Sequence, residues 1–97
     1  MIESFRDRGT EDIFEGRSTR LARKTCPALL WPAARRKLEQ LDRARYLDDL
    51  RAPPGNRLER LQGERLGCHS IRVNDQYRLC FRWGEDGPEQ VEIVDYH

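Results

Sequence analysis

The chain has 97 residues, 37% of them hydrophobic and 36% charged, and its formal net charge is +1. This length predicts one small domain (1–97) with a modest core, and eight aromatic residues argue against intrinsic disorder. Three cysteines without CxxC spacing argue against a disulfide framework and a zinc site, and no apolar run is long enough to span a membrane. We therefore expect a cytoplasmic protein.

The small net charge hides a strong segregation of charge along the chain. Residues 17–24 carry four basic side chains and no acid, whereas residues 84–97 carry five acids and no lysine or arginine. Local charge, rather than net charge, steers an anionic partner. Arg23 and Lys24 are therefore candidates for following a nucleic-acid backbone, although a solvated loop explains the same charges nearly as well.

The first half of the chain predicts helices after a short strand at Met1–Phe5. Thr10 is the expected cap of a helix at Glu11–Glu15, and Gly16 is its expected end. A longer helix is expected after Pro27, with one apolar face formed by Leu30, Ala34, Leu38 and Leu41. Pro32 lies inside this pattern and should kink the helix or move its start.

The second half of the chain predicts strands. The turn residues at 52–56 separate the two halves, and alternating patterns then predict strands at Arg57–Gln62, His69–Val73, Tyr77–Trp83 and Val91–Tyr96. A helical half followed by a strand half indicates an α+β fold, with helices on one face of a mainly antiparallel sheet.

The register of one hairpin bears on function. A three-residue turn at Asn74–Gln76 pairs Ile71 with Leu79, whereas a two-residue turn would pair Ile71 with a charged side chain. The first register places Arg72 opposite Arg78 on the polar face. Opposed like charges are destabilising, and either a bound anion or solvent exposure would relieve the repulsion.

The last three residues, Asp95, Tyr96 and His97, can all hold or move protons. His97 is a candidate general acid or base because imidazole titrates near neutrality, and Asp95 lies on the same strand face and could orient it. Tyr96 is expected on the opposite face. The alternative is a frayed terminus, which is common. His69 is expected to be a part-buried structural residue.

Several segments together resemble the HigB-type toxins, the plasmid maintenance system killer branch of the RelE/ParE superfamily. The similarity covers Ile2–Asp7, Arg36–Asp42, Pro53–Glu59, Ser70–Arg78 and Val91–His97. The resemblance implies a RelE-like α+β fold, with two N-terminal helices packed on a mainly antiparallel sheet of four to five strands.

The resemblance also implies a ribosome-dependent mRNA endonuclease that needs no cofactor or metal. Its implied partners are the 70S ribosome, mRNA and a HigA-like helix-turn-helix antitoxin, through which it reaches operator DNA. Asp95, Tyr96 and His97 carry over as the terminal catalytic group, and Arg78 carries over as the phosphate contact. The further basic candidates for RNA contact are Arg72, Arg57, Arg23 and Lys24.

Glu59 stands where some relatives place a catalytic histidine, and Gln62 stands where a lysine is often found. A carboxylate can act as a base but stabilises an anion poorly, so Glu59 is a candidate catalytic residue whose role differs from the family pattern. A gyrase poison of the ParE type and a non-catalytic nucleic-acid-binding member of the superfamily are the alternative functions.

Overall fold

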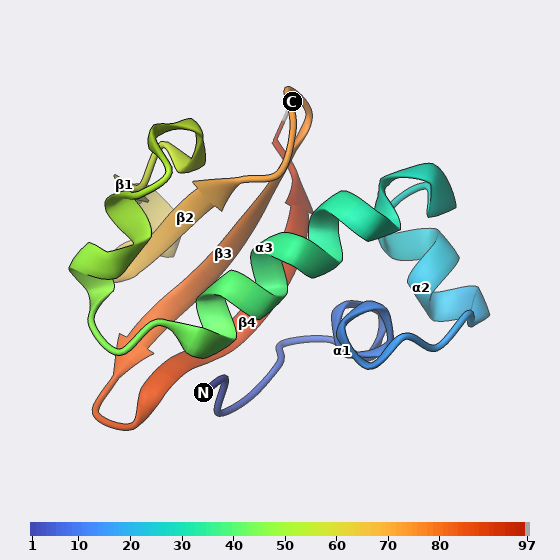
Figure 1. The fold of residues 1–97 in the computed structure, drawn as a ribbon, viewed down its shortest axis with the longest axis horizontal. Helices are drawn as coiled ribbons and strands as arrows, with labels where there is room; N and C mark the ends of the chain where they lie inside the picture. The colour runs from blue at the N-terminus through green and yellow to red at the C-terminus, as the bar shows by residue number, and fades with distance from the viewer. Residues whose placement is uncertain (97) are drawn as a thin grey trace.

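The protein forms two layers, in which helices cover one face of a four-stranded antiparallel sheet (Figure 1). The computed structural model describes residues 1–96. The sheet has the order β1-β2-β3-β4, with β1 at Glu59–Arg60, β2 at Cys68–Arg72, β3 at Tyr77–Gly84 and β4 at Gly87–Asp95. The predicted α+β architecture is confirmed.

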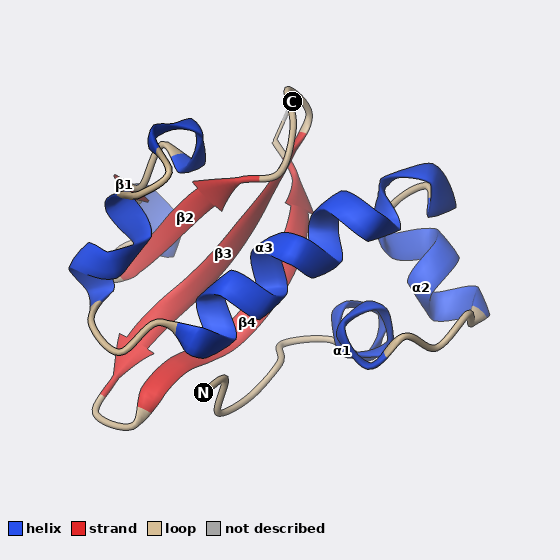
Figure 2. Ribbon diagram, viewed as in Figure 1, coloured by secondary structure: helices blue, strands red, loops and turns tan. Residues whose placement is uncertain are grey.

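Three α-helices precede the sheet: α1 at Arg8–Glu15, α2 at Arg20–Thr25 and α3 at Trp31–Arg43. Short 3₁₀ turns occupy Ala28–Leu30, Leu47–Arg51, Pro54–Asn56 and Gly63–Arg65. Figure 2 shows α3 lying across the sheet, with α1 and α2 to one side of it. Within residues 1–96, no helix is long and apolar enough to cross a membrane.

The apolar face of α3 is the one that the sequence predicts. Ala34, Leu38 and Leu41 are fully buried, and they join the sheet residues Leu79 and Phe81 in the main core. Pro32 lies in the first turn of α3, where a proline costs no hydrogen bond. The proline therefore moves the start of the helix and does not kink its interior.

The caps of α1 differ in part from prediction. Gly16 ends the helix in the left-handed conformation, with φ of 79°, as expected. The N-cap is Asp7 rather than Thr10: the Asp7 carboxylate accepts a hydrogen bond from the Thr10 backbone N–H at 2.7 Å. The Thr10 hydroxyl instead accepts a hydrogen bond from the Ile93 backbone N–H, which ties α1 to β4.

The basic segment 17–24, which could have been a solvated loop, contains α2. Helices α1 and α2 pack closely at Gly9, where a Cβ would lie 1.9 Å from Thr25 Oγ1. The buried Asp12 carboxylate accepts hydrogen bonds from Thr19 Oγ1 at 2.6 Å and Arg17 Nε at 2.9 Å. These hydrogen bonds, Thr19 foremost, and the arginine charge hold the pKa of Asp12 below its usual value.

Three strand predictions need correction. Met1–Phe5 is not a strand: it forms one isolated parallel bridge, from Phe5 to Val91, beside Gln90, whose backbone is left-handed (φ 51°). The strand predicted at Arg57–Gln62 shrinks to β1, Glu59–Arg60. The loop predicted at residues 84–88 is a tight turn, so β4 begins at Gly87 rather than Val91.

The predicted register of the β2–β3 hairpin is confirmed. Ile71 pairs with Leu79, and Arg72 pairs with Arg78. Ile71 and Leu79 belong to the core beneath the helices, so both arginines lie on the other face of the sheet. A second, smaller apolar cluster on that other face contains Leu61, Cys68 and Cys80, with Val94 packed against it.

Candidate active site

A cavity lined by charged side chains from several elements lies at the arginine-bearing face of the sheet. It has a volume of about 620 Å³ and is open to solvent. Its lining comes from the 55–59 segment, from β2 and β3 near the turn that joins them, from that turn, and from the last described residue. The lining residues are Gly55, Arg57, Glu59, Arg72, Asn74, Asp75, Arg78 and Tyr96.

Arg78 forms the base of this pocket and is only 8% exposed. Its Nε donates to Ser70 Oγ at 2.8 Å, and its Nη2 donates to the backbone carbonyl of Arg57 at 2.6 Å. Glu59 lies 3.7 Å from Nη2, and the ring centroid of Tyr96 lies 5.9 Å from the guanidinium carbon. Within residues 1–96, no hydrogen bond of Arg78 uses Nη1, so this N–H group can donate to a ligand.

The segment before β1 supplies the carbonyl that holds Arg78. Arg57 adopts the left-handed conformation, with φ of 46° and ψ of 58°, which is uncommon for a residue other than glycine. Non-glycine residues in this region concentrate at functional sites, where surrounding contacts maintain them. Here the left-handed residue ends the 3₁₀ turn and directs its carbonyl at Arg78, which also explains why the predicted strand is short.

A buried amide anchors this segment to α3. Asn56 is fully buried, and its Nδ2 donates to Gln40 Oε1 and the Leu50 carbonyl. Its Oδ1 accepts a hydrogen bond from Lys37 Nζ at 2.5 Å. Burial lowers the pKa of Lys37, and the charges of Arg36 and Arg72 lower it further.

The β2–β3 turn shapes the opposite wall of the pocket. Asn74 Oδ1 accepts hydrogen bonds from the backbone N–H groups of Gln76 at 2.9 Å and Tyr77 at 2.7 Å, which is the local hydrogen bonding typical of asparagine in turns. The turn thereby presents Asp75 to solvent, where its carboxylate pairs with the Arg72 guanidinium.

The same turn positions the C-terminal end of the described chain. The Tyr96 N–H donates to the Gln76 carbonyl at 2.7 Å, and Gln76 Nε2 donates to Asp95 Oδ2 at 3.0 Å. Asp95 pairs with Tyr77, whose pKa is raised by burial and then by the Asp95 charge. Tyr96 thus faces Arg78, whereas Asp95 lies on the helix-covered face. His97 lies outside the described residues.

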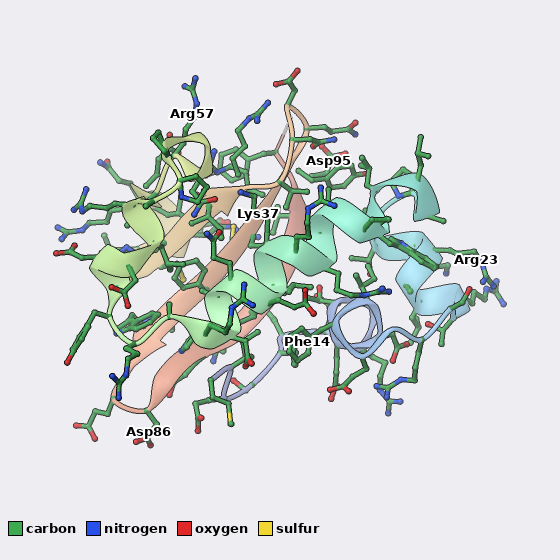
Figure 3. The ribbon with its side chains drawn as sticks, viewed as in Figure 1. Phe14, Arg23, Lys37, Arg57, Asp86 and Asp95 are labelled. Carbon is green, nitrogen blue, oxygen red and sulfur yellow. The ribbon has the colours of Figure 1, made fainter. Side chains whose placement is uncertain are left out.

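The structure brings together five of the residues predicted for the site: Arg57, Glu59, Arg72, Arg78 and Tyr96. It separates the basic residues of α2 from them. In Figure 3, Arg23 and Arg57 lie at opposite ends of the molecule, and Lys24 is an exposed neighbour of Arg23 on α2. A ligand small enough to occupy the pocket therefore cannot also contact α2.

Sequence reasoning missed the residues that hold the site in place, namely Ser70, Asn74, Gln76 and Asn56. Only Asn74 carried a usable signal, as an asparagine at the start of a predicted turn. The half-buried His69 lies outside the pocket against Phe81, with 6.1 Å between ring centroids, and burial lowers its pKa. Among residues 1–96, no group of three or more His, Cys, Asp and Glu side chains could hold a metal ion.

Comparison with known proteins identifies the family of this chain. Residues 3–97 match the protein family described as the RelE-like toxin of the type II toxin-antitoxin system HigB. The chain belongs to this HigB-like toxin family.

Two relatives are similar to this chain in sequence, and one solved structure is similar in fold. The chain is 45% identical to Toxin HigB-1 of Vibrio cholerae over 97 residues, which is all of this chain and 98% of that protein. It is 40% identical to an uncharacterized protein of Haemophilus influenzae over 57 residues, covering 59% of this chain and 56% of that protein. The fold is similar to a chain of the YoeB-YefM complex from Staphylococcus aureus, with a TM-score of 0.61 at 13% identity, covering 100% of this chain and 98% of that one.

Proposed function

We propose that this HigB-like toxin is an endoribonuclease that cleaves mRNA in the ribosomal A site. The observation that supports this most strongly is the way Arg78 is held: it is buried, it lines an open pocket, and Ser70 and the Arg57 carbonyl fix it, while its Nη1 makes no hydrogen bond within residues 1–96. A fixed cation at the bottom of an open pocket is suited to a phosphate group that belongs to a large substrate.

The proposed reaction starts from the 2′-hydroxyl of the mRNA. This oxygen attacks the adjacent phosphorus, a base takes its proton, and the bond from phosphorus to the 5′-oxygen breaks. An acid gives a proton to the leaving 5′-oxygen, so the products are a 2′,3′-cyclic phosphate and a 5′-hydroxyl. The negative charge that develops on the phosphoryl oxygens is the charge that Arg78 would stabilise, with Arg72 and Arg57 at the pocket wall.

The proton-transfer roles fall to the groups around this phosphate position. The ring centroid of Tyr96 lies 5.9 Å from the Arg78 guanidinium carbon, and we assign Tyr96 to proton transfer. Glu59, 3.7 Å from Arg78 and 55% exposed, is the candidate base. Asp95 and His97 complete the terminal group; Asp95 acts from the far side of the strand, through its contact with Gln76.

The proposed setting is the cytoplasm, where the toxin would meet the 70S ribosome and mRNA. Its proposed inhibitor is a HigA-like helix-turn-helix antitoxin, through which it would bind operator DNA. The name of the related Vibrio cholerae toxin and the toxin-antitoxin family assignment support a partner of this kind.

The test is primer extension on cellular mRNA after induced expression, with Tyr96→Phe as the key variant. Removing one proton-transfer group lowers such a rate by roughly 10²–10⁴-fold, so the variant should lose mRNA cleavage and growth arrest. Tyr46→Phe is the matched control, because Tyr46 is 70% exposed and lies outside the pocket. His97→Gln tests the terminal histidine in the same assay.

Three results would contradict the proposal in whole or in part. Full cleavage by Tyr96→Phe would remove tyrosine from the mechanism. Growth arrest with DNA damage signalling and intact mRNA would identify a gyrase poison, and absence of both responses would indicate a non-catalytic nucleic-acid-binding protein.

A further inference from the structure

The two opposed arginines of the pocket each have a carboxylate partner, but the two pairs differ. Arg78 is buried and makes hydrogen bonds to Ser70 and Arg57, and its approach to Glu59, at 3.7 Å, is loose. Arg78 is therefore held in position without its carboxylate.

Arg72 depends on its carboxylate partner. Its side chain is 35% exposed, and its hydrogen bond within residues 1–96 goes to Asp75. Asp75 itself is 97% exposed, at the rim of the pocket. The Asn74 side chain, not Asp75, supplies the hydrogen bonds that shape the turn. The Asp75 carboxylate is thus dispensable for the turn and occupies the anion position at Arg72.

We propose that Asp75 is an internal counter-ion of the phosphate site, which neutralises Arg72 in the free toxin and gives way when an RNA phosphate binds there. This inference rests on the proposed function. An exposed ion pair contributes little to stability, so its displacement is inexpensive. A phosphate offers the guanidinium the same kind of charged oxygen acceptors as the carboxylate.

The counter-ion has a consequence for selectivity. With Asp75 in place, an isolated anion gains little at Arg72, because it must first displace a carboxylate that is tethered to the same turn. A backbone that already engages Arg78 can meet this cost with its other contacts. Asp75 should therefore weaken the binding of all polyanions, and weaken it most for those that engage the pocket at Arg72 alone.

The test compares two charge-matched variants, Asp75→Asn and Asp86→Asn. Asp86 is an exposed acid in the β3–β4 turn, at the other end of the sheet from Arg57 in Figure 3, so its substitution changes net charge equally and leaves the pocket intact. The probe is a short, fluorescein-labelled single-stranded RNA with 2′-O-methyl riboses, which blocks cleavage, and affinity is measured by fluorescence anisotropy at several salt concentrations.

We expect Asp75→Asn to bind this RNA about 1.5- to 5-fold more tightly than Asp86→Asn, with the difference shrinking as salt rises. In a background of Arg72→Gln, the Asp75→Asn substitution should no longer change affinity, because its partner is gone. Equal thermal midpoints for the two asparagine variants would confirm that the turn is intact.

Three outcomes would overturn the inference. Equal affinities of Asp75→Asn and Asp86→Asn, or persistence of the gain without Arg72, would show that Asp75 does not compete at this site. Weaker binding by Asp75→Asn would make it an RNA contact. If the wild type cleaves mRNA in cells while the variants bind equally, only this inference fails; if the wild type neither binds nor cleaves RNA, the proposed function fails with it.

Discussion

Substitution of Ser70 by alanine isolates the support of Arg78 from the arginine itself. Ser70 is fully buried on β2, and its hydroxyl accepts the 2.8 Å hydrogen bond from Arg78 Nε. Alanine removes this acceptor and leaves a charged N–H group in a buried position. The Arg78 Nε–H group then regains a hydrogen-bond acceptor only if water enters the site or the Arg78 side chain moves.

The expected cost follows from the burial of both groups. A hydrogen bond to a charged group contributes about 1.5–3 kcal/mol, and leaving the charged partner unsatisfied places the loss within this range or above it. For a domain of this size each kcal/mol corresponds to about 4–8 °C, so the thermal midpoint should fall by roughly 6–24 °C. Ser18→Ala, at an exposed serine, is the control and should leave the midpoint unchanged.

The assay is thermal unfolding followed by circular dichroism, together with mRNA cleavage measured well below the midpoint. Because Arg78 loses one of its two principal anchors, cleavage by Ser70→Ala should also fall, by less than the roughly 10²–10³-fold loss typical of deleting a transition-state donor. If Ser70→Ala matches Ser18→Ala in both midpoint and cleavage, the buried hydrogen bond does not position Arg78.

Three further predictions concern the scaffold. Gly9→Ala should lower the free energy of unfolding by about 1–3 kcal/mol or more, because the new Cβ would overlap α2. The control Gly55→Ala should be neutral, because nothing lies within 4 Å of its Cβ. Urea unfolding of both variants checks this prediction. The pKa of Asp12 is lowered in the folded state, so its contribution to stability is present above about pH 4 and is lost as the pH falls through the folded pKa. Asp12→Asn should therefore flatten the acid part of a plot of stability against pH. An unchanged plot would contradict the Thr19 hydrogen bond as the cause. Burial raises the pKa of the Cys80 thiol to about 11, so the folded protein at pH 8 should protect Cys80 from iodoacetamide until urea exposes it. Peptide mapping of the labelled protein measures this protection. Rapid labelling of Cys80 in the folded protein would contradict its burial.

Local pattern was sufficient for the elements whose side chains repeat with the period of the backbone. The apolar spacing along α3 predicted its buried face, because residues three and four apart share one side of a helix. Alternation predicted the β2–β3 register, because a slip of one residue would have placed charge in the core. The opposition of Arg72 and Arg78 followed from that register and is confirmed.

Tertiary structure decided everything that depends on contacts between distant segments. The left-handed backbone of Arg57 and its carbonyl bond to Arg78 join residues 21 positions apart, and no local pattern encodes them. The Asn56 amide is fixed by α3 and by Leu50, and it determines where Arg57 can lie. Their positions follow from packing, which periodicity does not report.

The sequence alone determined the fold class, the paired arginines and the family resemblance, because backbone periodicity and local turn chemistry carry that information. Only the tertiary structure decided which of the charged and proton-bearing residues form one site. It placed Arg23, and with it the neighbouring Lys24 on α2, at the other end of the molecule from Arg57. It also placed Tyr96 next to Arg78 and Asp95 on the opposite face of the sheet. The physical reason is that a site depends on the relative placement of several elements, and that placement is fixed by the packing of the whole core.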